Sequence, residues 1–193
     1  MSDPQRIVLA SGSPRRLELL RAAGFDVEVL PPQGPEAIQD DKIGETPREL
    51  ASRNARVKAA EIRALRPDSI VIAADTVVDL DGRVFGKPVD LAQAAWMLGE
   101  LQGRIHQVVT AVCIVRGPAI CEFEEFTRVQ FHPMTAGDIC LYLERVAVLD
   151  KAGSYAAQED DGTMIAQIEG SFTNVVGLPM ERLQVALERH FLI

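Results

Sequence analysis

A short apolar strand that passes straight into the start of a helix is the feature that most constrains this chain. In IVLASGSPRR, residues 7–16, Ser13 stands where a helix N-cap is expected, because its side chain can accept a hydrogen bond from the first turn. Arg15 and Arg16 fall in that turn, where the helix dipole disfavours cations, so a bound anion would compensate. The backbone N–H groups, the Ser11 and Ser13 hydroxyls and two guanidinium groups suit a polyphosphate. A solvated arginine pair on an ordinary capped helix is the alternative.

Apolar, β-branched runs alternate with capped amphipathic segments along the 193 residues. This alternation predicts an α/β fold with a mixed, largely twisted β-sheet flanked by helices. A chain of this length is expected to form one domain, residues 1–193. The expected helices cover residues 13–23, 46–65, 90–103, 135–144 and a segment after Pro179. The expected strands cover residues 7–9, 25–30, 69–80, 106–116, 121–131 and 164–168, with a hairpin turn at Asp81 and Gly82.

The charge and the cysteine content exclude several classes of protein. A net charge of −8 argues against a partner that is nucleic acid or an anionic membrane, so a phosphate site needs a local basic cluster or a metal. The three cysteines show no C-x-x-C spacing, which favours reduced thiols in a cytoplasmic protein. The apolar run near the N-terminus is too short for a signal peptide, and no stretch reaches transmembrane length.

Asp75 and Lys87 are the first candidates for a catalytic pair. Asp75 follows the apolar run 70–74, and a carboxylate at the end of a strand is a candidate metal ligand or base. A two-residue turn at 81–82 would place Thr76 opposite Lys87, which brings the Lys87 ammonium within reach of Asp75. A turn-forming aspartate and a plain surface salt bridge are the alternatives.

Lys58 falls on the apolar face of the expected helix 46–65. A helix buries this face, so the lysine should point toward the body of the protein, where its ammonium would need an anion. The alternative is a side chain that runs along the edge of the helix into solvent. The apolar face is formed by Ala51, Ala55, Ile62 and Leu65.

Two loops carry further candidates. Residues 31–45 are rich in proline, glycine and acid, and Glu36 there could share a divalent cation with the strand carboxylate described above. Asp40 and Asp41 lie in the same loop. The second loop, residues 150–163, is acidic and contains glycine, and the amide of Gln158 there could orient water or bond a base. Solvated loop side chains are the ordinary alternative for all of them.

Four ordered motifs resemble those of the Maf (septum formation protein) family of nucleoside triphosphate pyrophosphatases. They are LASGSPRR, ARVKAAEI, AADTVVDLDGRVFGKP and IEGSFTNVVGLP, and the similarity spans nearly the whole chain. The resemblance implies an ITPase-like fold with two lobes around a central cleft. It also implies hydrolysis of a nucleoside triphosphate to the monophosphate and pyrophosphate, a divalent cation (Mg²⁺ or Mn²⁺) and a possible homodimer.

The resemblance also implies roles for individual residues. Those that would bind the substrate are Ser11, Ser13, Arg15, Arg16 and Thr76. Those that would hold the metal and help to activate water are Glu36 and Asp75. The developing phosphate charge would be neutralised by Lys58 and Lys87, and the site would be completed by Gln158.

Within the family, ADTVV together with Gln158 is more similar to the branch that acts on dTTP and UTP. Two positions depart from the family pattern. Pro35 precedes Glu36 where Asp is common, which keeps Asp40 and Asp41 open as metal ligands. The sequence Glu-Asp-Asp, residues 159–161, follows Gln158 where Gly is usual, and it could reshape the base pocket.

Other functions remain open from the sequence alone. A regulator of cell division that binds nucleotides without essential turnover is one alternative. A pyrophosphatase for modified purine triphosphates and a phosphomonoesterase are the others.

Overall fold

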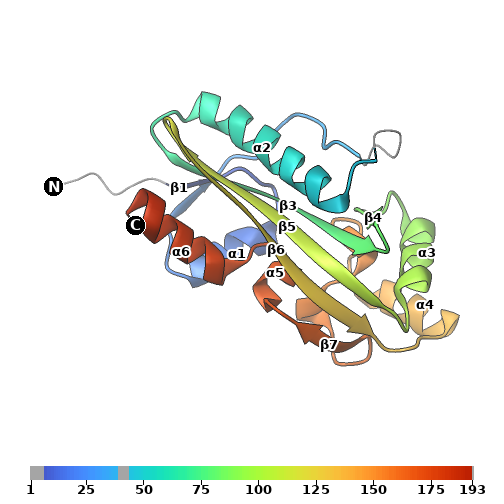
Figure 1. Cartoon of the computed structure of the whole chain (residues 1–193). Coiled ribbons are helices and arrows are strands. Elements are labelled where there is room, and N and C mark those ends of the chain that lie inside the picture. Colours follow the sequence, from blue (N-terminus) through green and yellow to red (C-terminus); the bar gives the residue numbers. More distant parts are fainter. Residues whose placement is uncertain (1–6, 39–43, 193) are drawn as a thin grey trace.

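The computed structural model describes residues 7–38 and 44–192, and it confirms the predicted mixed α/β fold (Figure 1). A seven-stranded sheet has the order β2-β1-β3-β5-β6-β7, with β4 also paired to β3. The first three strands of this order are parallel and the other pairings are antiparallel. The strands are β1 Ile7–Leu9, β2 Val27–Val29, β3 Ile70–Leu80, β4 Arg83–Phe85, β5 Ile105–Arg116, β6 Ala119–Phe131 and β7 Ile165–Glu169. The helices are α1 Pro14–Ala22, α2 Pro47–Leu65, α3 Leu91–Leu101, α4 Ala136–Arg145, α5 Phe172–Val176 and α6 Met180–Phe191, with 3-10 turns at Ala152–Ser154 and Ala157–Glu159.

The side chains of β3 alternate between two layers of helices. Ile70, Ile72 and Ala74 pack in a core with residues of α1 and α6. Val71 and Ala73 pack in a second core against α2, which lies on the opposite face of the sheet (Figure 1). Because successive side chains of a strand point to opposite faces, the next two residues of β3, Asp75 and Thr76, are directed toward α2 and toward α1 respectively.

One edge of β3 is open between two neighbouring strands. The pairing of β1 with β3 ends at Leu9 and Ile72, and the pairing with β4 starts only at Val78. Among the described strands, none pairs with residues 73–77 on that edge. Asp75 lies in the middle of this gap, so the prediction that it ends a strand is wrong. This edge of β3 is open because the neighbouring strands stop, while β3 itself continues to Leu80.

The turn at residues 81–82 is confirmed, but the ladder predicted from it is not. Asp81 and Gly82 adopt positive φ angles of 56° and 84°, as the two-residue hairpin requires. The ladder ends at the pair of Val78 and Phe85, so Thr76 does not pair with Lys87. Beyond Phe85 the chain leaves the sheet, which carries the Lys87 side chain away from the β3 backbone.

Helix caps define most of the helix starts as predicted. Thr46 and Thr135 each form a capping box, and the Asp90 side chain accepts from the Gln93 N–H. Ser13 occupies the N-cap position of α1, but its side chain makes no capping hydrogen bond. The short helix α5 was not predicted.

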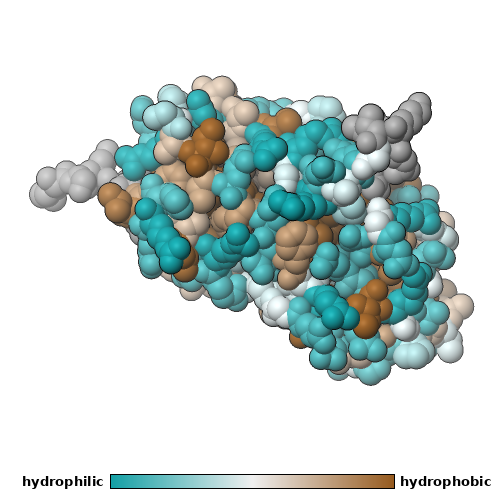
Figure 2. All heavy atoms as spheres, viewed as in Figure 1, coloured by the Kyte–Doolittle hydropathy of each residue, from teal (hydrophilic) through white to brown (hydrophobic). Residues whose placement is uncertain are grey.

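On the face in Figure 2, hydrophilic residues predominate and strongly hydrophobic residues stand apart from one another. Among the described residues, no helix has both the length and the apolar character needed to cross a bilayer.

Candidate active site

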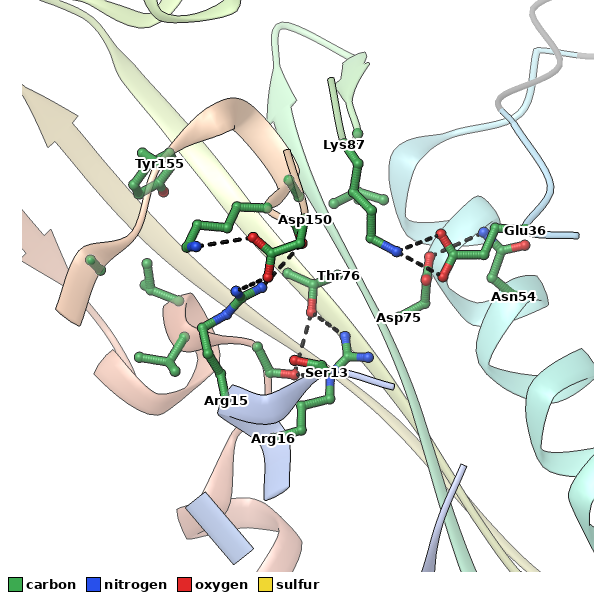
Figure 3. Close-up of a pocket in the computed structure, with 18 of the residues that line it drawn as sticks. Ser13, Arg15, Arg16, Glu36, Asn54, Asp75, Thr76, Lys87, Asp150 and Tyr155 are labelled. Atoms are coloured by element: carbon green, nitrogen blue, oxygen red, sulfur yellow. Dashed lines mark hydrogen bonds and ion pairs between the residues drawn. The ribbon is translucent and has the colours of Figure 1, made fainter. Parts of the chain in front are cut away.

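A cleft lies beside the open part of β3, and its walls come from segments far apart in the sequence. The lining residues belong to α1, α2, β3 and the segments 36–38, 86–87, 150–158 and 175–177. Its volume of about 330 Å³ is at the lower end of the range for small-molecule sites. Figure 3 shows Arg15, Arg16 and Asp150 on one side, and Glu36, Asn54 and Asp75 on the other.

Two carboxylates and two lysines form a chain of ion pairs on the α2 side. Lys58 Nζ lies 2.6 Å from Asp75 Oδ1 and 2.8 Å from Glu36 Oε1. Lys87 Nζ lies 2.9 Å from Glu36 Oε2. The predicted inward direction of Lys58 is confirmed, since the residue is 9% exposed. Lys87 reaches the cluster through Glu36, which replaces the predicted direct approach to Asp75.

Glu36 is held ionised by its two lysine partners. Burial alone would raise the pKa of its carboxyl group, but the charge of Lys58 and hydrogen bonds from Lys58 and Lys87 outweigh it and lower the pKa to about 2. Glu36 therefore carries its charge at neutral pH. The alternatives Asp40 and Asp41 lie outside the described residues.

Asn54 is a site residue that the sequence analysis missed. Its Nδ2 donates to Asp75 Oδ2 at 3.1 Å, and its amide also pairs with the backbone N–H and carbonyl of Ala37, each at 3.1 Å. Asn54 therefore ties the strand carboxylate to the segment that carries Glu36. The sequence does hold an indication of this role, because Asn54 lies one helical turn before Lys58 on the same buried face of α2.

Arg16 stands on the α1 side, and three of its five N–H groups are bonded within the protein. Its Nε donates to the Gly177 carbonyl at 2.8 Å, its Nη1 to Ser11 Oγ at 3.1 Å and its Nη2 to Thr76 Oγ1 at 3.0 Å. Thr76 Oγ1 in turn lies 2.9 Å from Thr110 Oγ1 on β5. Burial lowers the pKa of Arg16, against the opposing effect of Asp75 and Glu36. This network fixes the guanidinium plane at the wall of the cleft.

Arg15 crosses the cleft to Asp150, a residue that the sequence analysis did not single out. Its Nη1 lies 2.6 Å from Asp150 Oδ2, and Nη2 donates to the Asp150 carbonyl at 3.2 Å. Lys151 lies beside the same carboxylate, with Nζ 3.0 Å from Asp150 Oδ1. The acidic composition of the loop marked the region, but nothing local showed that its first carboxylate faces Arg15.

Most of the ten predicted site residues meet at this cleft. Eight of them line it, namely Ser13, Arg15, Arg16, Glu36, Asp75, Thr76, Lys87 and Gln158. Ser11 and Lys58 lie one layer behind, where they bond Arg16 and the two carboxylates respectively. The cleft can therefore bind an anion through its basic side chains, and its carboxylates face the same space.

Comparison with known proteins identifies the family. Residues 6–190 match the family described as Maf-like protein. The chain belongs to the Maf family. A relative from Symbiobacterium thermophilum, named dTTP/UTP pyrophosphatase, is 45% identical over 92% of this chain and 90% of its own length. Another of the same name, from Carboxydothermus hydrogenoformans, is 41% identical over 92% of this chain and 95% of its own length.

The fold of this Maf family member also resembles a solved structure. The Ham1 protein of Staphylococcus aureus superposes with a TM-score of 0.54 at 19% identity, and the match covers 95% of this chain and 98% of that one. This likeness supports the predicted fold, a twisted sheet flanked by helices.

Proposed function

We propose that this Maf family member hydrolyses dTTP and UTP to the nucleoside monophosphate and pyrophosphate, and so removes nucleotides from the cellular pool. The names of relatives that are more than 40% identical over nine-tenths of the chain support the reaction and the substrates. The observation that carries the proposal is that one cleft gathers these groups: the carboxylates Glu36 and Asp75 lie across it from Arg15 and Arg16.

The chemistry requires little more than positioning and charge. Water attacks the α-phosphorus, the bond from that phosphorus to the bridging oxygen breaks, and pyrophosphate leaves with the electron pair. Asp75 is suited to accept the proton of the attacking water, since Lys58 and Asn54 fix its two oxygens. The basic groups of the cleft would stabilise the charge on the phosphates, which is the main demand of phosphoryl transfer.

A divalent cation fits the donor set of Glu36 and Asp75. Both carboxylates approach one cationic atom, Lys58 Nζ, so they face the same region of the cleft. Among the described residues, no group of three or more His, Cys, Asp or Glu side chains that could hold a metal occurs. Mg²⁺ or Mn²⁺ would therefore need water and substrate phosphates as further ligands beside the two carboxylates. When bound, the cation would neutralise phosphate charge and make water more acidic.

The remaining residues are proposed to contact either the phosphates or the base of the nucleotide. Arg15, Arg16 and Lys87 are the proposed phosphate contacts, and Ser13 lies at the start of α1, whose N-terminal N–H groups favour anions. Thr76 and Gln158 are the proposed determinants of the pyrimidine preference. A homodimer and a cytoplasmic location stay predictions.

The test is a panel of nucleoside triphosphates with Mg²⁺ or Mn²⁺, in which pyrophosphate and inorganic phosphate are resolved. We expect pyrophosphate together with dTMP or UMP. Asp75→Asn should still fold, because Lys58 keeps its ion pair with Glu36, and should lower kcat by about 10² to 10⁴, the usual contribution of a general base. Release of inorganic phosphate alone would contradict the reaction, and no turnover with any nucleotide would favour a binding regulator.

A further inference from the structure

The ion pair between Arg15 and Asp150 joins two walls of the cleft. Arg15 belongs to the first turn of α1, and Asp150 begins the segment that carries Gln158. The guanidinium group contacts both the carboxylate and the main-chain carbonyl of Asp150, at 2.6 and 3.2 Å. Two contacts to one residue fix the orientation of the guanidinium plane as well as its place.

Asp150 is itself held by a buried lysine. The Lys151 side chain is 7% exposed, and its ammonium contacts Asp150 Oδ1, the Ala147 carbonyl and, at 3.8 Å, Glu159 Oε1. The Gly153 N–H donates to the Gly86 carbonyl at 3.1 Å, which docks the same segment beside Lys87. Asp150 therefore stands on an anchored segment.

We infer that Asp150 is a positioning residue for substrate binding: it holds Arg15 across the cleft so that the guanidinium group meets the phosphate chain. This inference rests on the proposed function. Among the described residues, the Arg15 guanidinium makes no hydrogen bond other than those to Asp150, so its other N–H groups can serve a ligand. The Asp150 carboxylate is shared between Arg15 and Lys151, so its charge is not balanced against Arg15 alone.

The competing hypothesis is that Asp150 occupies the place of a phosphate and must be displaced by the substrate. Two observations favour positioning. Displacement of the carboxylate would leave the contact from Arg15 to the Asp150 carbonyl in place, so the guanidinium group would still be tied to the segment. The Lys151 ammonium group also contacts the Asp150 carboxylate, which weakens the attraction between that carboxylate and Arg15. Asp150 is therefore a weaker competitor of a phosphate for Arg15.

The experiment measures binding of two unreactive probes, inorganic tripolyphosphate and dTTP with a methylene group between the α and β phosphorus atoms, by calorimetry with Mg²⁺. Asp150→Ala should weaken both probes about tenfold, the coupling expected for contacting residues. KM for dTTP should rise by a similar factor, with kcat changed less than threefold. Asp150→Glu should recover part of the affinity.

A double-mutant cycle separates positioning from a general loss of structure. In an Arg15→Ala background, Asp150→Ala should change the affinity for tripolyphosphate less than twofold, because the group that it positions is gone. Glu169→Ala is a matched control, since that carboxylate is 51% exposed against 52% for Asp150 and pairs with Arg128 outside the cleft. It should leave affinity and KM unchanged.

Two results would overturn the inference. Asp150→Ala could bind tripolyphosphate as well as or better than the wild type, as displacement of a rival anion predicts. Its loss of affinity could also be the same with and without Arg15. If the wild type releases no pyrophosphate from any nucleotide, the proposed function fails by itself, while the tripolyphosphate measurements still decide the role of Asp150.

Discussion

Lys58 Nζ lies 2.6 Å from Asp75 Oδ1, and the two side chains are only 11% and 9% exposed. The pair joins α2 to the open edge of β3. The second carboxylate oxygen of Asp75 is bonded by Asn54, so each carboxylate oxygen has a hydrogen-bond partner within the protein. A charge in such a place is tolerated because it is paired, and removal of the partner leaves the desolvation cost uncompensated.

Lys58→Met should therefore destabilise the protein and stop turnover. Loss of one partner of a buried pair costs about 3–5 kcal/mol, and the variant also loses the contact that fixes Asp75. The measurement is urea unfolding at pH 7, together with pyrophosphate release. Arg56→Met is the control, because Arg56 lies on the same helix and is 59% exposed in its pair with Glu122. It should cost less than about 1 kcal/mol. Equal losses in the two variants would contradict the argument.

The low pKa of Glu36 predicts a pH-dependent contribution to stability. The pKa of its carboxyl group is about 2 in the fold against 4.5 for the ordinary group. Between these pH values the unfolded chain binds more protons than the folded one, so stability falls as the pH falls. The contribution is complete above pH 4.5 and lost near pH 2. Because the side chain is 44% exposed, solvent screening limits the effect to about 1 kcal/mol.

Glu36→Gln isolates this contribution, because glutamine does not titrate. The free energy of unfolding, measured in urea at pH 7 and at pH 3, should differ between wild type and variant more at pH 7 than at pH 3. A difference that is the same at both pH values would show that the lysines do not stabilise the charged form of Glu36.

Features set by neighbouring residues were predictable from the sequence. Thr46, Asp90 and Thr135 mark helix starts because a cap and its N–H donors lie within four residues of each other. The burial of Lys58 followed from its place among alanines at helical spacing. The hairpin turn followed from Asp81 and its glycine. In each case the deciding contacts are local.

Features set by distant segments were not predictable in this way. The place of Asp75 at an open edge of β3 depends on where β1 ends and β4 begins, and neither end is encoded near residue 75. Arg15 and Asp150 are separated by 135 positions in the sequence. The family resemblance named residues that the fold brings together around one cleft, but only the folded chain showed that Ser11 lies behind Arg16.

A substitution at Gly153 tests whether the segment that carries Asp150 must keep its observed position in the fold. Its φ is +69°, and a Cβ there would lie 2.7 Å from Val78 Cγ2 and 3.3 Å from Tyr155 Cε1. Val78 is β-branched and 1% exposed, so it has no room to move. Gly153→Ala should lose about 1–2 kcal/mol for the left-handed backbone and about 1–3 kcal/mol more for overpacking.

Gly162→Ala is the matched control for the backbone term. Gly162 has a φ of +87° in the same loop, but nothing lies within 4 Å of its added Cβ. Thermal unfolding should therefore show a larger loss for Gly153→Ala than for Gly162→Ala. KM for dTTP should rise only in Gly153→Ala, because the crowded methyl group displaces the hydrogen bond to Gly86 and with it the segment that holds Arg15. Equal losses of stability in both variants, with KM unchanged, would show that the close contact with Val78 does not hold the segment in place.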